Sequence, residues 1–185
     1  MTEHVVVERR GAINAIRMNR PDKKNAITRA MYAAMAAALK AGDADGDVRC
    51  HVILGVPGAF SAGNDLMDFL AVAQGGDGGM EVWDFLLALA GAQKPIVSGA
   101  DGIAVGIGTT MHFHCDMTFA TPRTEFRTPF VDLALVPEAG SSLLAPMLLG
   151  RQQAFALLAL GDGMPAERAQ AAGLVYKVVS EGELE

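Results

Sequence analysis

Short β-branched apolar runs alternate along this chain with longer apolar segments of helical period, and this alternation constrains the fold more than any other feature. Runs such as Cys50–Leu54, Met117–Ala120 and Leu174–Val179 are typical of buried strands. Met80–Ala90 is long and apolar enough to form a helix between two of them. Because parallel strands need long crossover connections, the alternation predicts an α/β layered fold with parallel strand pairing.

The N-terminal part of the chain predicts a hairpin followed by a helix. Val5–Val7 and Ala12–Met18 flank a turn, so these two runs are expected to pair with each other. Thr28 is expected to be the N-cap of an alanine-rich helix. Gly42 is expected to end that helix as its C′ residue, a position that glycine favours.

Two further helical regions are predicted in the second half of the chain. Gly106 and Gly108 open a segment that is expected to run as a helix to about Cys115. Pro137 is expected to stand at the start of a helix, because proline is favoured in the first helical turn. That helix is expected to continue through Ser141–Leu149, and another is expected to follow it over residues 151–160.

Composition and charge limit the class of protein. Of the 185 residues, 51% are hydrophobic and 19% are charged, which is sufficient for one sizeable core in a single domain over residues 1–185. The formal net charge is −6 and no basic stripe stands out, so we expect neither a nucleic-acid nor a membrane partner. No apolar run approaches the length of about 18 residues that a membrane-spanning helix needs.

The cysteines and the N-terminal residues indicate where the protein is located. Cys50 and Cys115 belong to no CxxC pair, which favours reduced thiols over a disulfide scaffold or a zinc site. The first residues, MTEHVVVERRG, lack the apolar core of a signal peptide. We therefore expect a cytoplasmic protein.

The segment GIGTT, residues 106–110, is a candidate anion-binding turn. A dinucleotide fingerprint would need glycine where Met111 stands. Two glycines at the start of a helix still allow a ligand to approach closely, with backbone N–H groups pointing toward it. The alternative is an ordinary tight turn between a strand and a helix. His112 and His114 are two residues apart and share no helical face, so we expect no metal site.

Glu138 is the candidate catalytic residue that the sequence itself offers. It follows the apolar run Leu133–Val136 and stands near the predicted start of a helix. Two interpretations remain open. The carboxylate is either a first-turn residue stabilised by the helix dipole, or a base in an apolar cleft whose pKa burial would raise into a useful range.

An ordered set of motifs resembles the crotonase, or enoyl-CoA hydratase/isomerase, superfamily. The segments are NRPDKKNAIT (19–28), FSAGNDLMDF (60–69), KPIVSGADGIAVGIGTTMHFHCDMTFAT (94–121), FRTPFVDLALVPEAGSSLLAPMLLG (126–150) and AAGLVYKVV (171–179). The resemblance implies the α/β crotonase fold, a spiral of ββα repeats, with residues 1–185 as the core domain. It also implies a homotrimer or hexamer, and a C-terminal helical segment of the family that is missing from this chain.

The resemblance further implies an acyl-CoA thioester as the substrate. The backbone N–H groups of Asn64 and Ile107 match the oxyanion hole of the family. Contacts with CoA are implied for five consecutive residues of the FSAGNDL segment and one lysine, namely Ala62, Gly63, Asn64, Asp65, Leu66 and Lys24. Because CoA is part of the substrate, no separate cofactor is implied.

The motifs most resemble the peroxisomal-type Δ3,Δ2-enoyl-CoA isomerase branch. The two positions that carry glutamate in hydratases are Thr110 and Phe130 here, whereas Glu138 matches the catalytic glutamate of the isomerases. The implied reaction is conversion of 3-enoyl-CoA to 2-enoyl-CoA in fatty-acid β-oxidation. Apolar walls for the acyl chain are expected from a few side chains near these motifs: Phe130, Leu133, Leu135, and Trp83 or Phe85.

Two other functions remain open. A hydratase-type or other crotonase reaction would need Asp132 or Asp65 to supply the missing acid or base. A non-catalytic acyl-CoA-binding module would keep the fold without turnover.

Overall fold

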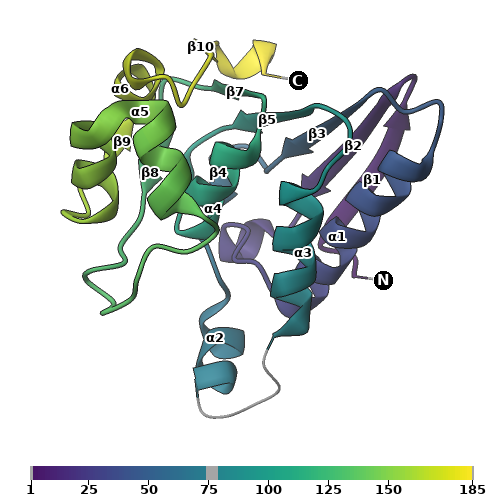
Figure 1. Ribbon diagram of the computed structural model, residues 1–185. Coiled ribbons are helices and arrows are strands. Elements are labelled where there is room, and N and C mark those ends of the chain that lie inside the picture. The colour runs from purple at the N-terminus through teal and green to yellow at the C-terminus, as the bar shows by residue number, and fades with distance from the viewer. Residues whose placement is uncertain (1, 74–78, 185) are drawn as a thin grey trace.

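The computed structural model describes residues 2–73 and 79–184, which form two β-sheets with helices packed around them (Figure 1). The six-stranded sheet has the order β1-β2-β3-β5-β7-β10, and the four-stranded sheet has the order β4-β6-β8-β9. The strands are β1 (Val5–Arg10), β2 (Ile13–Met18), β3 (Cys50–Leu54), β4 (Ala59–Ser61), β5 (Ile96–Ala100), β6 (Ile103–Val105), β7 (Met117–Ala120), β8 (Glu125–Arg127), β9 (Met164–Pro165) and β10 (Lys177–Val178). The helices are α1 (Arg29–Ala44), α2 (Leu66–Ala73), α3 (Met80–Ala90), α4 (Ile107–Thr110), α5 (Ser141–Leu158) and α6 (Ala166–Ala172), with 3-10 turns η1 (Pro21–Lys23), η2 (Met111–His114) and η3 (Glu181–Glu183).

Parallel pairing dominates the six-stranded sheet, as the sequence predicts. The pairs β2–β3, β3–β5, β5–β7 and β7–β10 are parallel, whereas the predicted hairpin β1–β2 is antiparallel. In this register Ile53 of β3 lies between Ile16 of β2 and Ser98 of β5. All three side chains are buried, which is the environment that the apolar strand runs indicate.

The chain passes repeatedly from one sheet to the other. β3 is followed by β4 and α2, β5 by β6 and α4, and β7 by β8 and α5. Each pass leaves one strand in each sheet and then a helix, which confirms the predicted spiral of ββα repeats. The turn between β5 and β6 packs closely against the turn between β3 and β4, because a Cβ on Gly102 (φ +74°) would lie 2.0 Å from the carbonyl oxygen of Gly58.

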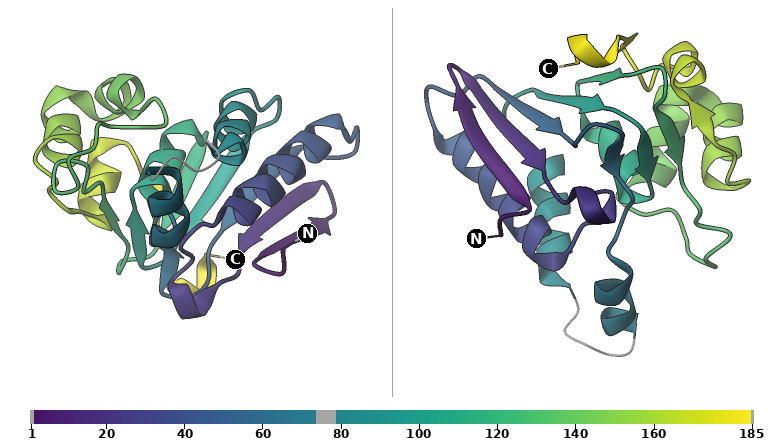
Figure 2. Two further views of the ribbon diagram at one scale, coloured as in Figure 1. Left: turned by 90° about the horizontal axis from the view of Figure 1, so that it is seen from below. Right: turned by 180° about the vertical axis from the view of Figure 1, so that it is seen from behind.

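Helices α1 and α3 lie side by side on one face of the six-stranded sheet (Figures 1 and 2). The rings of Tyr32 in α1 and Phe85 in α3 meet with centroids 5.4 Å apart. The buried apolar side chains of these two helices include Met31, Met35, Leu39, Phe85 and Leu89. Within residues 2–73 and 79–184, no helix is long and apolar enough to cross a membrane.

Helix α1 begins as predicted but ends later. The Thr28 side chain accepts a hydrogen bond from the backbone N–H of Met31, so Thr28 is the N-cap. The prediction that Gly42 ends the helix is wrong, because α1 continues to Ala44. Gly42 is buried against β2 and β3, where an added Cβ would lie 2.5 Å from atoms of Asn14 and His51. Close packing, rather than a turn, therefore requires glycine at this position.

The prediction of a helix starting at Pro137 is also wrong. Helix α5 begins at Ser141, and Gly140 (φ +67°) is its N-cap. The preceding segment is irregular and places Ala134 and Ala139 in the left-handed region. The two helical regions predicted on either side of Gly150 join into α5, with Gly150 as a non-helical kink at φ 74°.

Candidate active site

The irregular segment between β8 and α5 brings Glu138 to helix α4. The hydroxyl of Thr110 donates to Oε1 of Glu138 over 2.7 Å. Burial raises the pKa of the Glu138 carboxyl above its ordinary value, and the hydrogen bond from Thr110 acts in the opposite direction. Because Glu138 precedes the first residue of α5 by three positions, it is not the first-turn residue that one interpretation predicted.

The first residue of helix α4, Ile107, presents a free backbone N–H. Gly106 precedes the helix at φ 56° and ψ −121°, and its N–H donates to the carbonyl of Arg127. The N–H groups of Thr109 and Thr110 both donate to the carbonyl of Gly106. The first amide of a helix has no partner within the helix. In the described chain the Ile107 N–H has no protein acceptor.

The loop that follows β4 presents a second free N–H. Ile27 exchanges two hydrogen bonds with this loop, because its N–H donates to Gly63 and its carbonyl accepts from Asp65. In this parallel bridge Asn64 is the partner of Ile27, and the Asn64 N–H points the other way. Over the described ranges, that N–H donates to no protein acceptor.

Close packing places these two free amides on adjoining segments. An added Cβ on Gly63 would lie 2.8 Å from the carbonyl oxygen of Val105, one residue before Gly106. An added Cβ on Gly108 would lie 2.8 Å from the carbonyl oxygen of Ser61. Glycine at both positions therefore lets the loop after β4 and the start of α4 contact each other directly.

The side chain of Asn64 is held by a buried tyrosine. The hydroxyl of Tyr32 donates to Oδ1 of Asn64. Burial raises the pKa of Tyr32 well above its ordinary value, and the negative charge of Glu138 raises it further. Glu138 is therefore near enough to act electrostatically on Tyr32, so α1, the loop after β4 and the segment before α5 converge here.

The remaining predicted CoA-binding residues lie in this loop or beside it. Asp65 forms an ion pair with Arg20 over 2.7 Å and accepts hydrogen bonds from the first residues of α2. These contacts lower the pKa of Asp65, with the hydrogen bond from Arg20 as the largest lowering cause, opposed by burial. Leu66 and Lys24 are exposed. The carbonyl of Lys24 accepts from the N–H of Ala62, which fixes the loop beside the lysine.

The residues expected to line an acyl pocket divide into two groups. Phe85 and Phe130 are buried in the hydrophobic core. Trp83, Leu133 and Leu135 are exposed. Asp132, the candidate second carboxylate for hydration, is also exposed and lies near Gly161 beyond the end of α5.

Residues 8–185 match the family profile described as "Enoyl-CoA hydratase/isomerase". The chain belongs to the enoyl-CoA hydratase/isomerase family.

Named relatives within the family catalyse more than one reaction. Enoyl-CoA delta isomerase 2 of Rattus norvegicus is 36% identical in an alignment that covers 98% of this chain and 47% of the rat protein. The 1,2-epoxyphenylacetyl-CoA isomerase of Escherichia coli K12 is 31% identical over 100% of this chain and 72% of its own length. The mitochondrial enoyl-CoA hydratase of Pongo abelii is 28% identical over 95% of this chain and 62% of its own length.

Solved structures of the family share the fold. The enoyl-CoA hydratase/isomerase of Pseudoalteromonas atlantica T6c superposes with a TM-score of 0.93 at 37% identity, over 98% of this chain and 72% of that one. OdaA of Pseudomonas aeruginosa superposes with a TM-score of 0.91 at 42% identity, over 97% and 72%. This chain therefore spans about half of the rat relative and about 72% of these two structures.

Sequence reasoning did not find two partners of the site in this family member. The sequence marks Thr110 only as a replacement for a hydratase glutamate and does not predict its hydrogen bond to Glu138. Tyr32 was not singled out, although a tyrosine on the Met- and Leu-bearing face of an alanine-rich helix is a usable signal. A buried phenol hydroxyl usually has a hydrogen-bond partner, and Asn64 is that partner here.

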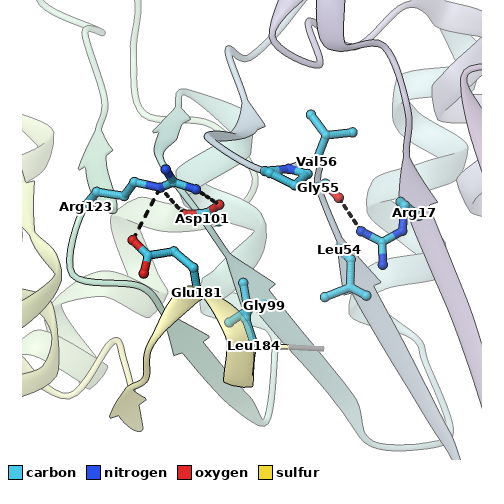
Figure 3. Close-up of a pocket in the computed structure, with 10 residues that line it drawn as sticks. Arg17, Leu54, Gly55, Val56, Gly99, Asp101, Arg123, Glu181 and Leu184 are labelled. Atoms are coloured by element: carbon cyan, nitrogen blue, oxygen red, sulfur yellow. Dashed lines mark hydrogen bonds and ion pairs between the residues drawn. The ribbon is translucent and has the colours of Figure 1, made fainter.

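Figure 3 shows a pocket whose lining contains none of these site residues. Its lining includes Arg17, Leu54, Gly99, Asp101, Arg123, Glu181 and Leu184. Arg123 binds Asp101 through two hydrogen bonds of 2.6 and 2.5 Å, which are the largest cause lowering the pKa of Asp101 to about 2. Asp101 also accepts from the Thr121 hydroxyl and the Gly58 N–H, so it joins three turns of the two sheets. These bonds give Asp101 a structural role.

Proposed function

We propose that this protein moves the double bond of a 3-enoyl-CoA to the 2-position, with Glu138 as its single acid/base. The observation that carries the proposal is the contact between Glu138 and helix α4. A half-buried carboxyl with a raised pKa is hydrogen-bonded to the same helix whose first amide is free. Because double-bond migration needs only one group to accept and return a proton, one such carboxyl is sufficient.

The reaction proceeds through a dienolate. Ionised Glu138 removes a proton from the α-carbon, and the electron pair of that C–H bond moves toward the thioester carbonyl oxygen. The N–H groups of Asn64 and Ile107 donate to this oxygen, and one such donor can contribute about 3 kcal/mol in the transition state. Protonated Glu138 then returns its proton to the γ-carbon, which restores the carbonyl and leaves the double bond between the α- and β-carbons.

The CoA part of the substrate is proposed to lie along the loop after β4. Ala62, Gly63, Asn64 and Asp65 form this loop, and Leu66 begins α2 directly after it. The exposed Lys24 beside the loop offers a positive charge to a phosphate. The step is balanced without a redox group or metal, so no cofactor beyond the substrate's own CoA is required. Assembly as a homotrimer or hexamer, and a place in fatty-acid β-oxidation, stay predictions.

Replacing Glu138 by glutamine tests the proposal. Glu138→Gln keeps the size of the side chain but cannot accept a proton, so kcat for isomerisation of a 3-enoyl-CoA should fall about 10²- to 10⁴-fold. Glu8→Gln is the matched control, because Glu8 is an exposed carboxylate paired with Arg10 on β1. Isomerisation is measured by following formation of the conjugated 2-enoyl thioester.

Three outcomes contradict the proposal. Equal rates for the wild-type chain and Glu138→Gln would show that another group transfers the proton. Water addition to a 2-enoyl-CoA that depends on Asp132 or Asp65 would favour hydration instead. Binding of acyl-CoA esters without turnover of either substrate would indicate a non-catalytic module.

A further inference from the structure

Thr110 makes an unusual use of its hydroxyl. Helical threonines commonly donate to a backbone carbonyl in the preceding turn. The hydroxyl of Thr109 also lies against main-chain carbonyls, at 2.6 Å from the oxygen of Ala104 in β6 and 3.0 Å from that of Arg127 in β8. The hydroxyl of the fully buried Thr110 instead donates to Oε1 of Glu138 over 2.7 Å. Within the described residues this is the hydrogen bond that satisfies the Thr110 hydroxyl.

The backbone around Glu138 is fixed by other groups. The N–H of Ser141 donates to the carbonyl of Glu138 over 3.0 Å. Nε2 of His114 lies 2.8 Å from the carbonyl oxygen of Ala139 and donates to it. These contacts fix the main chain at Glu138 and at the residue after it but not the rotation of the Glu138 side chain, which is left to Thr110.

We propose that Thr110 is a positioning residue, which holds Oε1 of Glu138 so that Oε2 is the oxygen that removes and returns the proton. This inference rests on the proposed function. A hydroxyl that faces an ionised carboxylate must be the donor, since the carboxylate has no proton to give. With Oε1 occupied, the lone pairs of Oε2 are available to the substrate.

The same short helix sets the distance between base and oxyanion donor. Ile107 is the first residue of α4 and Thr110 is the last, so the free N–H and the positioning hydroxyl belong to one rigid turn. The two groups cannot move independently. Thr110 therefore places Glu138 relative to the thioester oxygen as well as fixing its rotation.

Thr110 also changes the protonation of Glu138. A hydrogen bond to the charged form of a carboxyl favours that form, so loss of the hydroxyl should raise the pKa of Glu138 further. The titratable groups beside Glu138 are Tyr32 of α1, whose pKa its charge raises, and His114 of η2, which binds the next carbonyl. Both remain when Thr110 is replaced.

Direct titration of the Glu138 carboxyl tests this role without reference to activity. Glutamate is labelled with ¹³C at the carboxyl carbon, and the Glu138 signal is assigned by its loss in Glu138→Gln. Thr110→Val removes the hydroxyl at nearly constant volume and should raise the pKa of Glu138 by about one pH unit. Thr110→Ser keeps the hydroxyl and should restore the wild-type pKa. Thr110→Ala gives the same test if the valine variant does not fold.

Kinetics supply the second measurement. Thr110→Val should lower kcat about tenfold, with little change in KM, and should move the acidic limb of the rate profile to higher pH. Thr110→Ser should recover both. Thr109→Val is the control, because its hydroxyl binds main-chain carbonyls and its loss should leave the pKa of Glu138 unmoved.

The two proposals fail separately. A Glu138 pKa that is unchanged in Thr110→Val and Thr110→Ala overturns the role of Thr110, whatever the activity. An unchanged kcat and rate profile in these variants also overturns it. If the wild-type chain shows no isomerisation, the proposed function fails, and a shifted titration still supports Thr110 as the residue that orients the carboxyl.

Discussion

At the scale of single residues, two opposing effects act on the Glu138 carboxyl. Burial favours its neutral form and raises the pKa, whereas the Thr110 hydroxyl favours the charged form. Burial is the larger effect, so the pKa stays above the ordinary value of 4.5. The carboxyl is thereby a better proton acceptor than an exposed glutamate.

This balance predicts the pH dependence of the reaction. Glu138 acts as a base only when ionised, so kcat/KM should fall as pH decreases through the raised pKa. The acidic limb should therefore lie above pH 4.5, and it is measured from kcat/KM between pH 4 and 9. A limb at or below pH 4.5 would contradict the buried environment of Glu138.

The candidate acid/base could be predicted from the sequence, but its surroundings could not. Glu138 stands out as a carboxylate after an apolar run, and family resemblance supports a catalytic role. Its bond to Thr110 joins residues 28 positions apart. No local pattern indicates such a contact, because it depends on where the irregular segment 131–140 leads the chain.

At the scale of secondary-structure elements, α4 is the part that organises the site. Its four residues supply a free amide at one end and the Thr110 hydroxyl at the other. Gly108 lets this helix pack directly against the end of β4, because no side chain would fit between Gly108 and Ser61. The position of α4, and hence of both groups, is set by that contact.

Adding one methyl group at Gly108 should displace the helix. In Gly108→Ala the new Cβ would lie 2.8 Å from the Ser61 carbonyl oxygen, so either α4 or β4 must shift. We expect a loss of about 1–3 kcal/mol in the free energy of unfolding. We also expect turnover to fall at least tenfold, because catalysis is sensitive to small displacements. Thermal denaturation and the isomerisation assay measure the two effects.

Gly46→Ala is the matched control for this variant. Gly46 lies in an exposed turn where an added Cβ would meet no atom within 4 Å. Its stability and turnover should stay close to those of the wild-type chain. If Gly108→Ala behaves like Gly46→Ala, the contact between α4 and β4 does not set the position of the site.

The bounds of helices and strands can be predicted where they depend on neighbouring residues, and not where they depend on contacts with other elements. The N-cap at Thr28 and the hairpin β1–β2 follow from neighbouring residues and were predicted. Gly42 was misassigned as a helix end, because its requirement for glycine comes from Asn14 and His51 in other elements. Pro137 was misassigned because the left-handed residues Ala139 and Gly140 delay the helix to Ser141.

At the scale of the whole molecule, His112 joins the two sheets. Its ring packs against Phe60 of β4 and Phe126 of β8, with centroids 4.5 and 5.2 Å away. Its Nδ1 lies 2.8 Å from the hydroxyl of Ser98 in β5, which also contacts Thr118 of β7. Burial lowers the pKa of His112 to about 3. The sequence predicted the parallel sheets but gave no sign of this link between them.

His112 should make the stability of the fold sensitive to moderate acid. Between its folded pKa of about 3 and its ordinary value of 6.5, only the unfolded chain binds the proton. The free energy of unfolding should therefore decrease as pH falls below 6.5, by about 2 kcal/mol between pH 6.5 and 5 from this group. Urea denaturation at several pH values measures this decrease.

A non-ionising variant isolates the contribution of His112. His112→Asn should be less stable than the wild-type chain at pH 7, because it loses the ring contacts with Phe60 and Phe126. Its stability should nevertheless depend less steeply on pH between 6.5 and 5. An equal slope in the two proteins would mean that His112 already binds a proton in the folded state.

The proposed oxyanion donors of this site are main-chain groups, and that has an evolutionary consequence. Mutation can exchange the side chains of Asn64 and Ile107 but cannot remove their amides, so the capacity to hold a negative oxygen survives sequence drift as long as the backbone path does. Residues 110 and 138 carry no such protection. Homologues with this backbone can therefore acquire new reactions through exchange at those two positions, while the two main-chain amides are inherited unchanged.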